Sequence, residues 1–92
     1  MLEIKRRGDI LMELITGKIT SIVFPDGKIK CPSAIGWTVS FYDDIALDKS
    51  MLMFKKDSGY ISTSRVAKVE RSNNRIIVHT KNSIYYIDLE AS

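Results

Sequence analysis

The stretch YISTSRVAKVERSNNRIIVHTKNSIYYIDLE, residues 60–90, decides the fold class. It holds three runs, 65–71, 75–80 and 84–89, which contain Val, Ile and Tyr and are separated by SNN and KNS. β-Branched and aromatic residues favour strands, and asparagine tolerates the left-handed backbone of tight turns. The stretch therefore predicts an antiparallel meander of three strands.

The side chains of these strands indicate how the sheet is covered. In the last run, Tyr85, Ile87 and Leu89 fall on one face of the strand, because successive residues point to opposite faces. In residues 75–80 both faces carry apolar residues. A sheet covered on both sides, as in a barrel, a sandwich or a dimer, would account for this pattern.

Two stretches before residue 60 predict further strands. FPDGK, residues 24–28, separates an apolar run from an alternating one at 28–31 and predicts a hairpin, because proline presets φ and glycine accepts a positive φ. In residues 37–42, WTVSFY, polar residues alternate with Trp37, Val39 and Phe41, as in a strand with one buried face.

The remaining segments before residue 60 are interpreted as turns and connectors, apart from one further strand at SMLMFKK. We expect a connector before Trp37, a turn or one short helical turn over 43–49, an extended apolar run at SMLMFKK, and a turn at KKDSGY.

The N-terminal part fits two structures. Apolar residues at 10, 11, 14 and 15 match one face of a helix over residues 9–16, with Asp9 as N-cap and Gly17 just past the end. A strand from about residue 10 to residue 24 with a bend at Gly17 fits the same residues. Residues 1–11 are also interpreted as an extension, with Met12 as an alternative start.

Together these patterns predict a mainly β protein. We expect one small antiparallel barrel-like or sandwich domain over residues 1–92, with about six short strands and at most one short helix, near the start or around 43–49. A domain of this size buries only a modest share of its surface, which favours a homo-oligomer.

The composition indicates the cellular compartment of the protein and which kinds of functional site to expect. No apolar run is long enough to span a bilayer and no signal peptide is evident, so we expect a cytoplasmic protein with no membrane partner. Cys31 is the only cysteine and His79 the only histidine, and they lie far apart in the sequence. We therefore predict no catalytic residues, no metal site and no cofactor.

One pattern in the last third of the chain resembles other proteins. TSRV, a charged hairpin and then TKNSIYYI are similar to a pattern, T-S-x-V followed by T-x-N-S-x-Y, of small uncharacterised bacterial and phage proteins. The resemblance implies a small β-rich domain, and an accessory protein of bacterial or phage origin, rather than an activity.

The polar residues of the same pattern are the candidates for a ligand site. Hydroxyl and amide groups beside an arginine suit a phosphate-bearing ligand, because the guanidinium is a planar fork that matches phosphate. The structural alternative is that these side chains hold turns through their own backbone. The candidate ligand-binding residues are Thr63, Ser64, Arg65, Lys81, Asn82 and Ser83.

A nucleic-acid site is a further alternative. The net charge is +3, and small β-barrels bind single strands with basic grooves and surface aromatics. The candidates for this surface are Lys28, Lys30, Lys55, Lys56, Arg71, Arg75 and Tyr60.

The function expected from the sequence is a non-catalytic binding or interaction module that acts as a homo-oligomer. Its partner would be a protein or a small anionic ligand. A single-stranded nucleic acid and a nucleotide or other phosphorylated small molecule are the two specific alternatives.

Overall fold

The described part of the chain is built of antiparallel strands. The computed structural model describes residues 4–7, 10–30, 32–42 and 45–90. Its elements are β1 (Ile4–Arg7), β2 (Ile10–Val23), a 3-10 turn η1 (Pro32–Ala34), β3 (Thr38–Tyr42), β4 (Ser50–Lys55), β5 (Tyr60–Arg71), β6 (Arg75–Thr80) and β7 (Ile84–Leu89). Within these ranges η1 is the only helical element, so the predicted mainly β class is confirmed.

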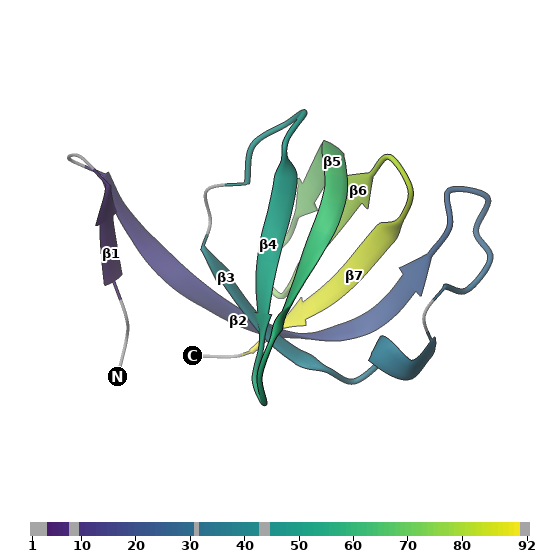
Figure 1. The fold of residues 1–92 in the computed structure, drawn as a ribbon, viewed down its shortest axis with the longest axis horizontal. Coiled ribbons are helices and arrows are strands. Elements are labelled where there is room, and N and C mark those ends of the chain that lie inside the picture. The colour runs from purple at the N-terminus through teal and green to yellow at the C-terminus, as the bar shows by residue number, and fades with distance from the viewer. Residues whose placement is uncertain (1–3, 8–9, 31, 43–44, 91–92) are drawn as a thin grey trace.

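Strands β2 to β7 close into a ring (Figure 1). Each strand pairs with the next one along the chain, and β2 also pairs with β7. Closing a sheet on itself removes its free edges, which is the usual solution for a small antiparallel barrel. The six-stranded, barrel-like form of the prediction is thereby confirmed. Strand β1 lies outside the ring, and among the described strands it pairs with the beginning of β2 alone.

Strand β2 closes the ring by pairing with two neighbours in succession. Its residues 14–18 pair with β3 and its residues 17–23 pair with β7. Where the two sets overlap, a Cβ on Gly17 would lie 2.7 Å from the carbonyl oxygen of Asp88 and 2.8 Å from Cγ2 of Ile87. Glycine is therefore required here by close backbone approach.

The strand interpretation of the N-terminal part is confirmed for residues 10–23, and the helix interpretation is wrong for the described residues. The apolar positions fit a helical face, but pairing with β1, β3 and β7 satisfies the backbone groups of this segment as a strand. The expected N-cap, Asp9, lies outside the described residues. Residues 45–49 contain a turn and no helix, and the short helical element lies instead in the connector before β3.

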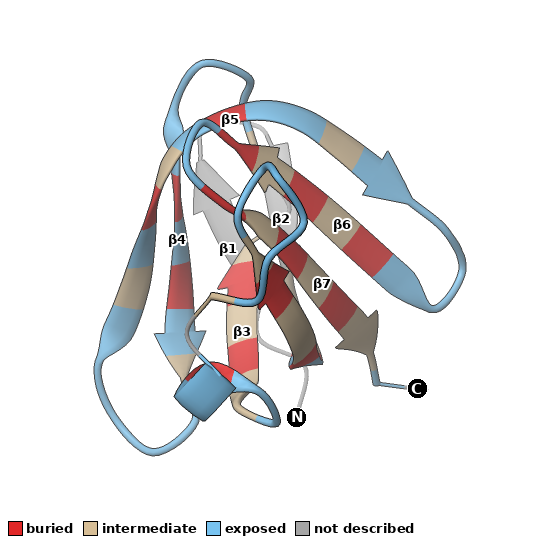
Figure 2. Ribbon diagram, turned by 90° about the vertical axis from the view of Figure 1, so that its right-hand side faces the viewer, coloured by how far each residue is buried: buried red, intermediate tan, exposed pale blue. Residues whose placement is uncertain are grey.

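Alternate residues of the strands fill the barrel, as the bands along β6 and β7 in Figure 2 show. Val39 and Phe41 of β3 and Ile87 of β7 are fully buried, so the predicted alternation in both segments is confirmed. The buried apolar residues are Ile19, Ile22, Ala34, Val39, Phe41, Met51, Met53, Val66, Ile76, Val78, Tyr85 and Ile87.

The predicted turns form as expected, with one difference. Phe24 and Lys28 bond across the PDG turn, in which Gly27 has a φ of 91°. The predicted strand after this turn does not form in the described residues. Its place is taken by a single β-bridge between Val23 and Ile29. The 3-10 turn that follows begins at Pro32, a residue that has no N–H to donate to a strand partner.

No helix in the described residues is both long enough and apolar enough to cross a membrane.

Candidate functional site

Strand β5 turns a corner of the barrel at residues 63–67. It pairs with β4 up to Arg65 and with β6 from Val66, and one extra residue of β5 interrupts the register on each side of this point. Bulges of this kind bend a strand and re-aim its side chains. The hydroxyl of Thr63 accepts the N–H of Met51 at 2.9 Å and donates to the carbonyl of Ser64 at 2.7 Å. The buried Thr63 hydroxyl therefore holds the bend.

A hydroxyl network ties this corner to the turn between β6 and β7. Oγ1 of the buried Thr80 donates to the carbonyl of Ser83 at 2.8 Å and accepts the N–H of Ser83 at 3.0 Å. The same oxygen accepts the hydroxyl of Ser64 at 2.9 Å, and Oγ of Ser64 accepts the N–H of Asn82 at 3.1 Å. The corner and the turn are thus joined through side chains as well as through the sheet.

We expect Thr80→Val to lower the free energy of unfolding by about 2 kcal/mol, because it leaves the buried Ser83 N–H without this acceptor. Urea denaturation measures the change. Thr38→Val is the matched control on a half-buried strand position and should shift stability by less than about 0.5 kcal/mol. Equal stability of both variants would contradict a structural role for the network.

The six candidate ligand residues come from two segments, and the structure brings these segments together. The N–H of Lys81 donates to the carbonyl of Arg65 at 3.0 Å. Thr63 and Ser83 are buried, and Oγ of Ser83 accepts Nζ of Lys30 at 2.7 Å. The Thr63 side chain fits the structural alternative, because it bonds backbone groups, whereas the Ser83 hydroxyl bonds the side chain of Lys30.

Three of the six candidates line an open surface pocket of about 720 Å³ at the corner. Its lining residues are Asp48, Ser50, Ser64, Arg65, Val66, Ala67 and Lys81. We call this the corner pocket.

Sequence reasoning missed Asp48 and Ser50 of the corner pocket. Ser50 lies there because it is the register partner of Arg65 across β4 and β5. Asp48 is held by its N–H, which donates to the carbonyl of Val66 at 2.7 Å, and it has a positive φ of 67°. Aspartate tolerates this conformation better than most residues. Neither placement has a local signal in the sequence, since both depend on which strand pairs with β5.

The corner pocket combines two cations with hydroxyl groups. Arg65 and Lys81 are exposed, and within the described part of the chain neither side chain forms an ion pair. Ser50 and Ser64 add hydroxyls, and Asp48 adds one carboxylate. The pocket therefore offers donors for an anion and one acceptor beside them.

A second exposed feature is the outer face of β4 and the start of β5. Leu52, Phe54 and Tyr60 are 44%, 41% and 64% exposed, and Phe54 lies directly opposite Tyr60 across the two strands. We call these three residues the outer face. A groove beside it is lined by Tyr42, Ile45, Ala46, Lys49, Ser50, Met51, Leu52 and Phe54.

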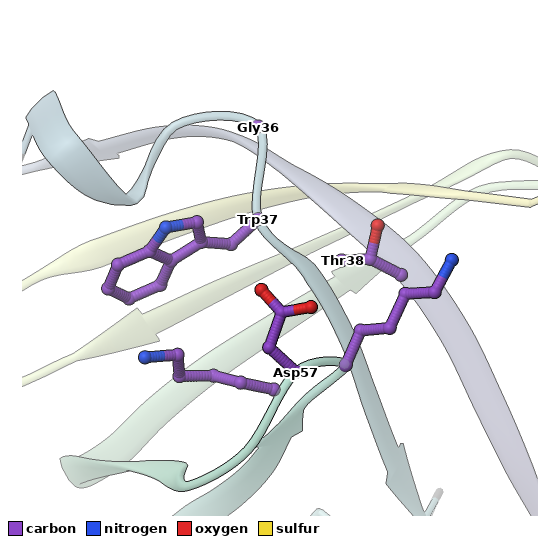
Figure 3. Close-up of a pocket in the computed structure, with 6 residues that line it drawn as sticks. Gly36, Trp37, Thr38 and Asp57 are labelled. Atoms are coloured by element: carbon purple, nitrogen blue, oxygen red, sulfur yellow. The ribbon is translucent and has the colours of Figure 1, made fainter.

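The nucleic-acid candidates fall in three different connections. Lys55, Lys56 and Tyr60 belong to the β4–β5 hairpin, where Nζ of Lys55 lies 4.2 Å from the centre of the Trp37 ring. Figure 3 shows this region, a small pocket lined by Gly36, Trp37, Thr38, Lys55, Lys56 and Asp57.

The remaining nucleic-acid candidates lie elsewhere. Arg71 and Arg75 flank the β5–β6 hairpin, which is on the opposite side of the molecule from the β4–β5 hairpin in Figure 2. Nε of Arg75 is 2.7 Å from Oδ1 of Asp88, and this hydrogen bond raises the pKa of Arg75. Lys28 and Lys30 lie after the PDG turn. The structure does not bring these cations into one stripe.

His79 is paired on the outside of the sheet. Nε2 of His79 contacts Oε2 of Glu70, and this hydrogen bond, followed by the charge of Lys68, lowers the pKa of Glu70. Cys31 lies outside the described residues. In the part of the chain that the structure describes, no three His, Cys, Asp or Glu side chains are grouped so as to hold a metal ion.

Comparison with protein-family models, with curated proteins and with solved structures gave no match to this chain.

Proposed function

We propose that this protein is a non-catalytic binding module that holds the phosphate group of a small ligand in the corner pocket. The observation that carries the proposal is that Arg65 and Lys81 line the same pocket. The two residues are joined by the Lys81 N–H to Arg65 carbonyl bond, and their exposed side chains lack ion pairs in the described residues. Two cations that line one pocket and form no ion pair within the described residues favour an anion.

The chemistry of the lining favours a nucleotide over a bare phosphate. The Arg65 guanidinium can bond two phosphate oxygens at once, and the Lys81 ammonium adds a point charge. Asp48 would repel a free phosphate, but its carboxylate suits the hydroxyls of a ribose or the amino group of a base. A ligand with a phosphate at one end and donor groups at the other matches this set.

Isothermal titration calorimetry with adenosine and guanosine mono- and diphosphates tests the proposal. We expect Arg65→Gln and Lys81→Gln each to weaken binding about tenfold or more, because a hydrogen bond to a charged group contributes about 1.5 to 3 kcal/mol. Lys68→Gln is the matched control, since it removes one exposed charge from the same strand outside the pocket. No binding by any of these ligands at millimolar concentration would contradict the proposal, as would a wild-type affinity in Arg65→Gln.

A single-stranded oligonucleotide belongs in the same titration as a comparator. Binding that is confined to the oligonucleotide and weakens steeply with salt would favour the nucleic-acid alternative.

The proposal also includes the oligomeric state, the cellular compartment and the origin of the protein. We propose that it works as a homo-oligomer in the cytoplasm, as an accessory protein of bacterial or phage origin. The small size of the domain supports association between copies. The origin rests on the TSRV and TKNSIYYI resemblance alone.

A further inference from the structure

Two pockets adjoin beside the β4–β5 hairpin. The pocket of Figure 3 has a volume of about 230 Å³, and its neighbour has a volume of about 410 Å³. Thr38, Lys55 and Lys56 line both pockets, so the two are parts of one groove, which we call the hairpin groove. The second part is lined in addition by Thr16, Ser40, Phe54 and Glu90.

The sheet holds the lining of the second part in one row. Ser40 of β3 pairs with Thr16 of β2 on one side and with Phe54 of β4 on the other. Directly opposite residues of paired strands point to the same face of a sheet, so these three side chains lie next to one another on it. Thr38 is two residues before Ser40 and points to the same face. The N–H of Lys56 donates to the Thr38 carbonyl at 3.0 Å, which fixes the hairpin against β3.

Each part of the hairpin groove contains one aromatic side chain. Trp37 is half-buried, and Nζ of Lys55 lies 4.2 Å from the centre of its ring, so the ammonium covers one ring face. Phe54 in the second part is 41% exposed. In Figure 3 the Trp37 ring, the Thr38 hydroxyl and the Asp57 carboxyl lie around the same space. A ligand in the groove would therefore contact aromatic carbon as well as polar groups.

Four polar side chains of the groove are without partners in the described residues. No hydrogen bond or ion pair within this part of the chain involves the side chains of Thr38, Lys56, Asp57 and Glu90. The groove contains two basic side chains, Lys55 and Lys56, and two acidic ones, Asp57 and Glu90, so the formal charge of its lining is zero. It therefore offers donors and acceptors without an excess of either charge.

An uncharged sugar chain matches this lining better than the other common biological polymers do. A sugar hydroxyl both donates and accepts hydrogen bonds, as those of Ser and Thr do, and the C–H groups of a sugar ring can pack on aromatic carbon. A nucleic-acid strand would bring its phosphates against as many carboxylates as ammonium groups. A peptide that adds to a sheet needs an unpaired strand edge, and β3 is paired on both sides here.

We propose that the hairpin groove binds an uncharged oligosaccharide, with one sugar ring against the Trp37 indole and the next one against Phe54. The carboxylates of Asp57 and Glu90 accept hydrogen bonds from sugar hydroxyls, and the Lys56 ammonium donates to them. The groove shares no lining residue with the corner pocket. The oligosaccharide site is therefore a second binding function, independent of the phosphate site.

Trp37 gives this site its own signal, because it is the only tryptophan in the chain. Its fluorescence is followed while the full chain is titrated with the uncharged trisaccharides maltotriose, cellotriose, mannotriose and triacetylchitotriose. We expect a saturable change at millimolar concentration with at least one of them. Added salt should leave this binding unaltered, because the ligand carries no charge for salt to screen.

Lys56→Gln and Asp57→Asn should each weaken the trisaccharide about tenfold, because a hydrogen bond to a charged group is lost. Both residues are exposed in the β4–β5 hairpin, so both variants should keep the melting temperature of the wild type. Lys68→Gln is the matched control that should bind as the wild type does, since it removes an exposed charge outside the groove.

No fluorescence change with any of the trisaccharides would overturn the inference, as would wild-type affinity in either groove variant. A change confined to a single-stranded oligothymidylate, and weakening steeply with salt, would overturn it as well and would indicate a nucleic-acid strand in the groove.

Discussion

Replacing Phe41 with alanine is expected to lower the free energy of unfolding by about 4 kcal/mol, in the range that a fully buried phenylalanine gives. Phe41 is fully buried and is the largest of the fully buried side chains. It packs among residues from several strands of the ring, so the cavity lies where neighbours cannot collapse without breaking strand pairing. Domains of this length have a total stability of about 5 to 14 kcal/mol. The variant should therefore keep about 1 to 10 kcal/mol of stability.

Urea denaturation followed by circular dichroism measures this effect, with Phe24→Ala as the matched control. Phe24 is 42% exposed beside the PDG turn, so the same change there should cost less than about 1 kcal/mol. If Phe41→Ala cost no more than Phe24→Ala, residue 41 would not point into a closed barrel.

Gly17→Val is expected to destabilise the protein by about 3 kcal/mol, because it forces side-chain atoms into packed backbone. At Gly17 a Cβ would already lie 2.7 Å from the carbonyl oxygen of Asp88, and backbone on both sides of β2 is held by pairing. Since 1 kcal/mol shifts the midpoint by roughly 4 to 8 °C in a domain this small, Tm should fall by about 12 to 24 °C.

Gly36→Ala separates crowding from backbone strain. Gly36 has a φ of 94°, and no atom lies within 4 Å of the place that a Cβ would take, so alanine there meets strain without a clash. We expect a loss of about 1 kcal/mol for Gly36→Ala, clearly less than at position 17. A Gly17→Val variant as stable as the wild type would mean that β2 does not pair with β3 and β7 at the same residue.

The strands and turns of this fold were predictable where the signal is local. Alternation marked Val39 and Phe41, and the SNN and KNS turns placed β6 and β7, because the strand period and turn chemistry are properties of a few neighbouring residues. The N-terminal segment stayed ambiguous because apolar residues at 10, 11, 14 and 15 fit a helix and a strand equally well. Pairing with β1 at residues 10–13 and with β3 at residues 14–16 decided the outcome, and the pairing with β3 joins distant parts of the chain and has no local signature.

The candidate site was predictable only in part for a similar reason. Hydroxyl-rich turns pointed to Ser64, Arg65 and Lys81, which do meet at the corner pocket. The same composition also selected Thr63 and Ser83, because a hydroxyl that bonds another group of the protein looks identical in sequence to one that awaits a ligand. Burial distinguishes the two cases, and burial depends on how distant strands and turns pack together.

The most direct test of the central claim is a two-dimensional NMR titration of the protein with a nucleoside monophosphate. Binding at the corner pocket predicts the largest amide shifts at Ser64, Arg65 and Lys81, whose backbone and side chains form the corner. Amide shifts confined to the β4–β5 and β5–β6 hairpins, or no shifts at millimolar ligand, would contradict the claim that this barrel brings Arg65 and Lys81 together to hold a phosphate.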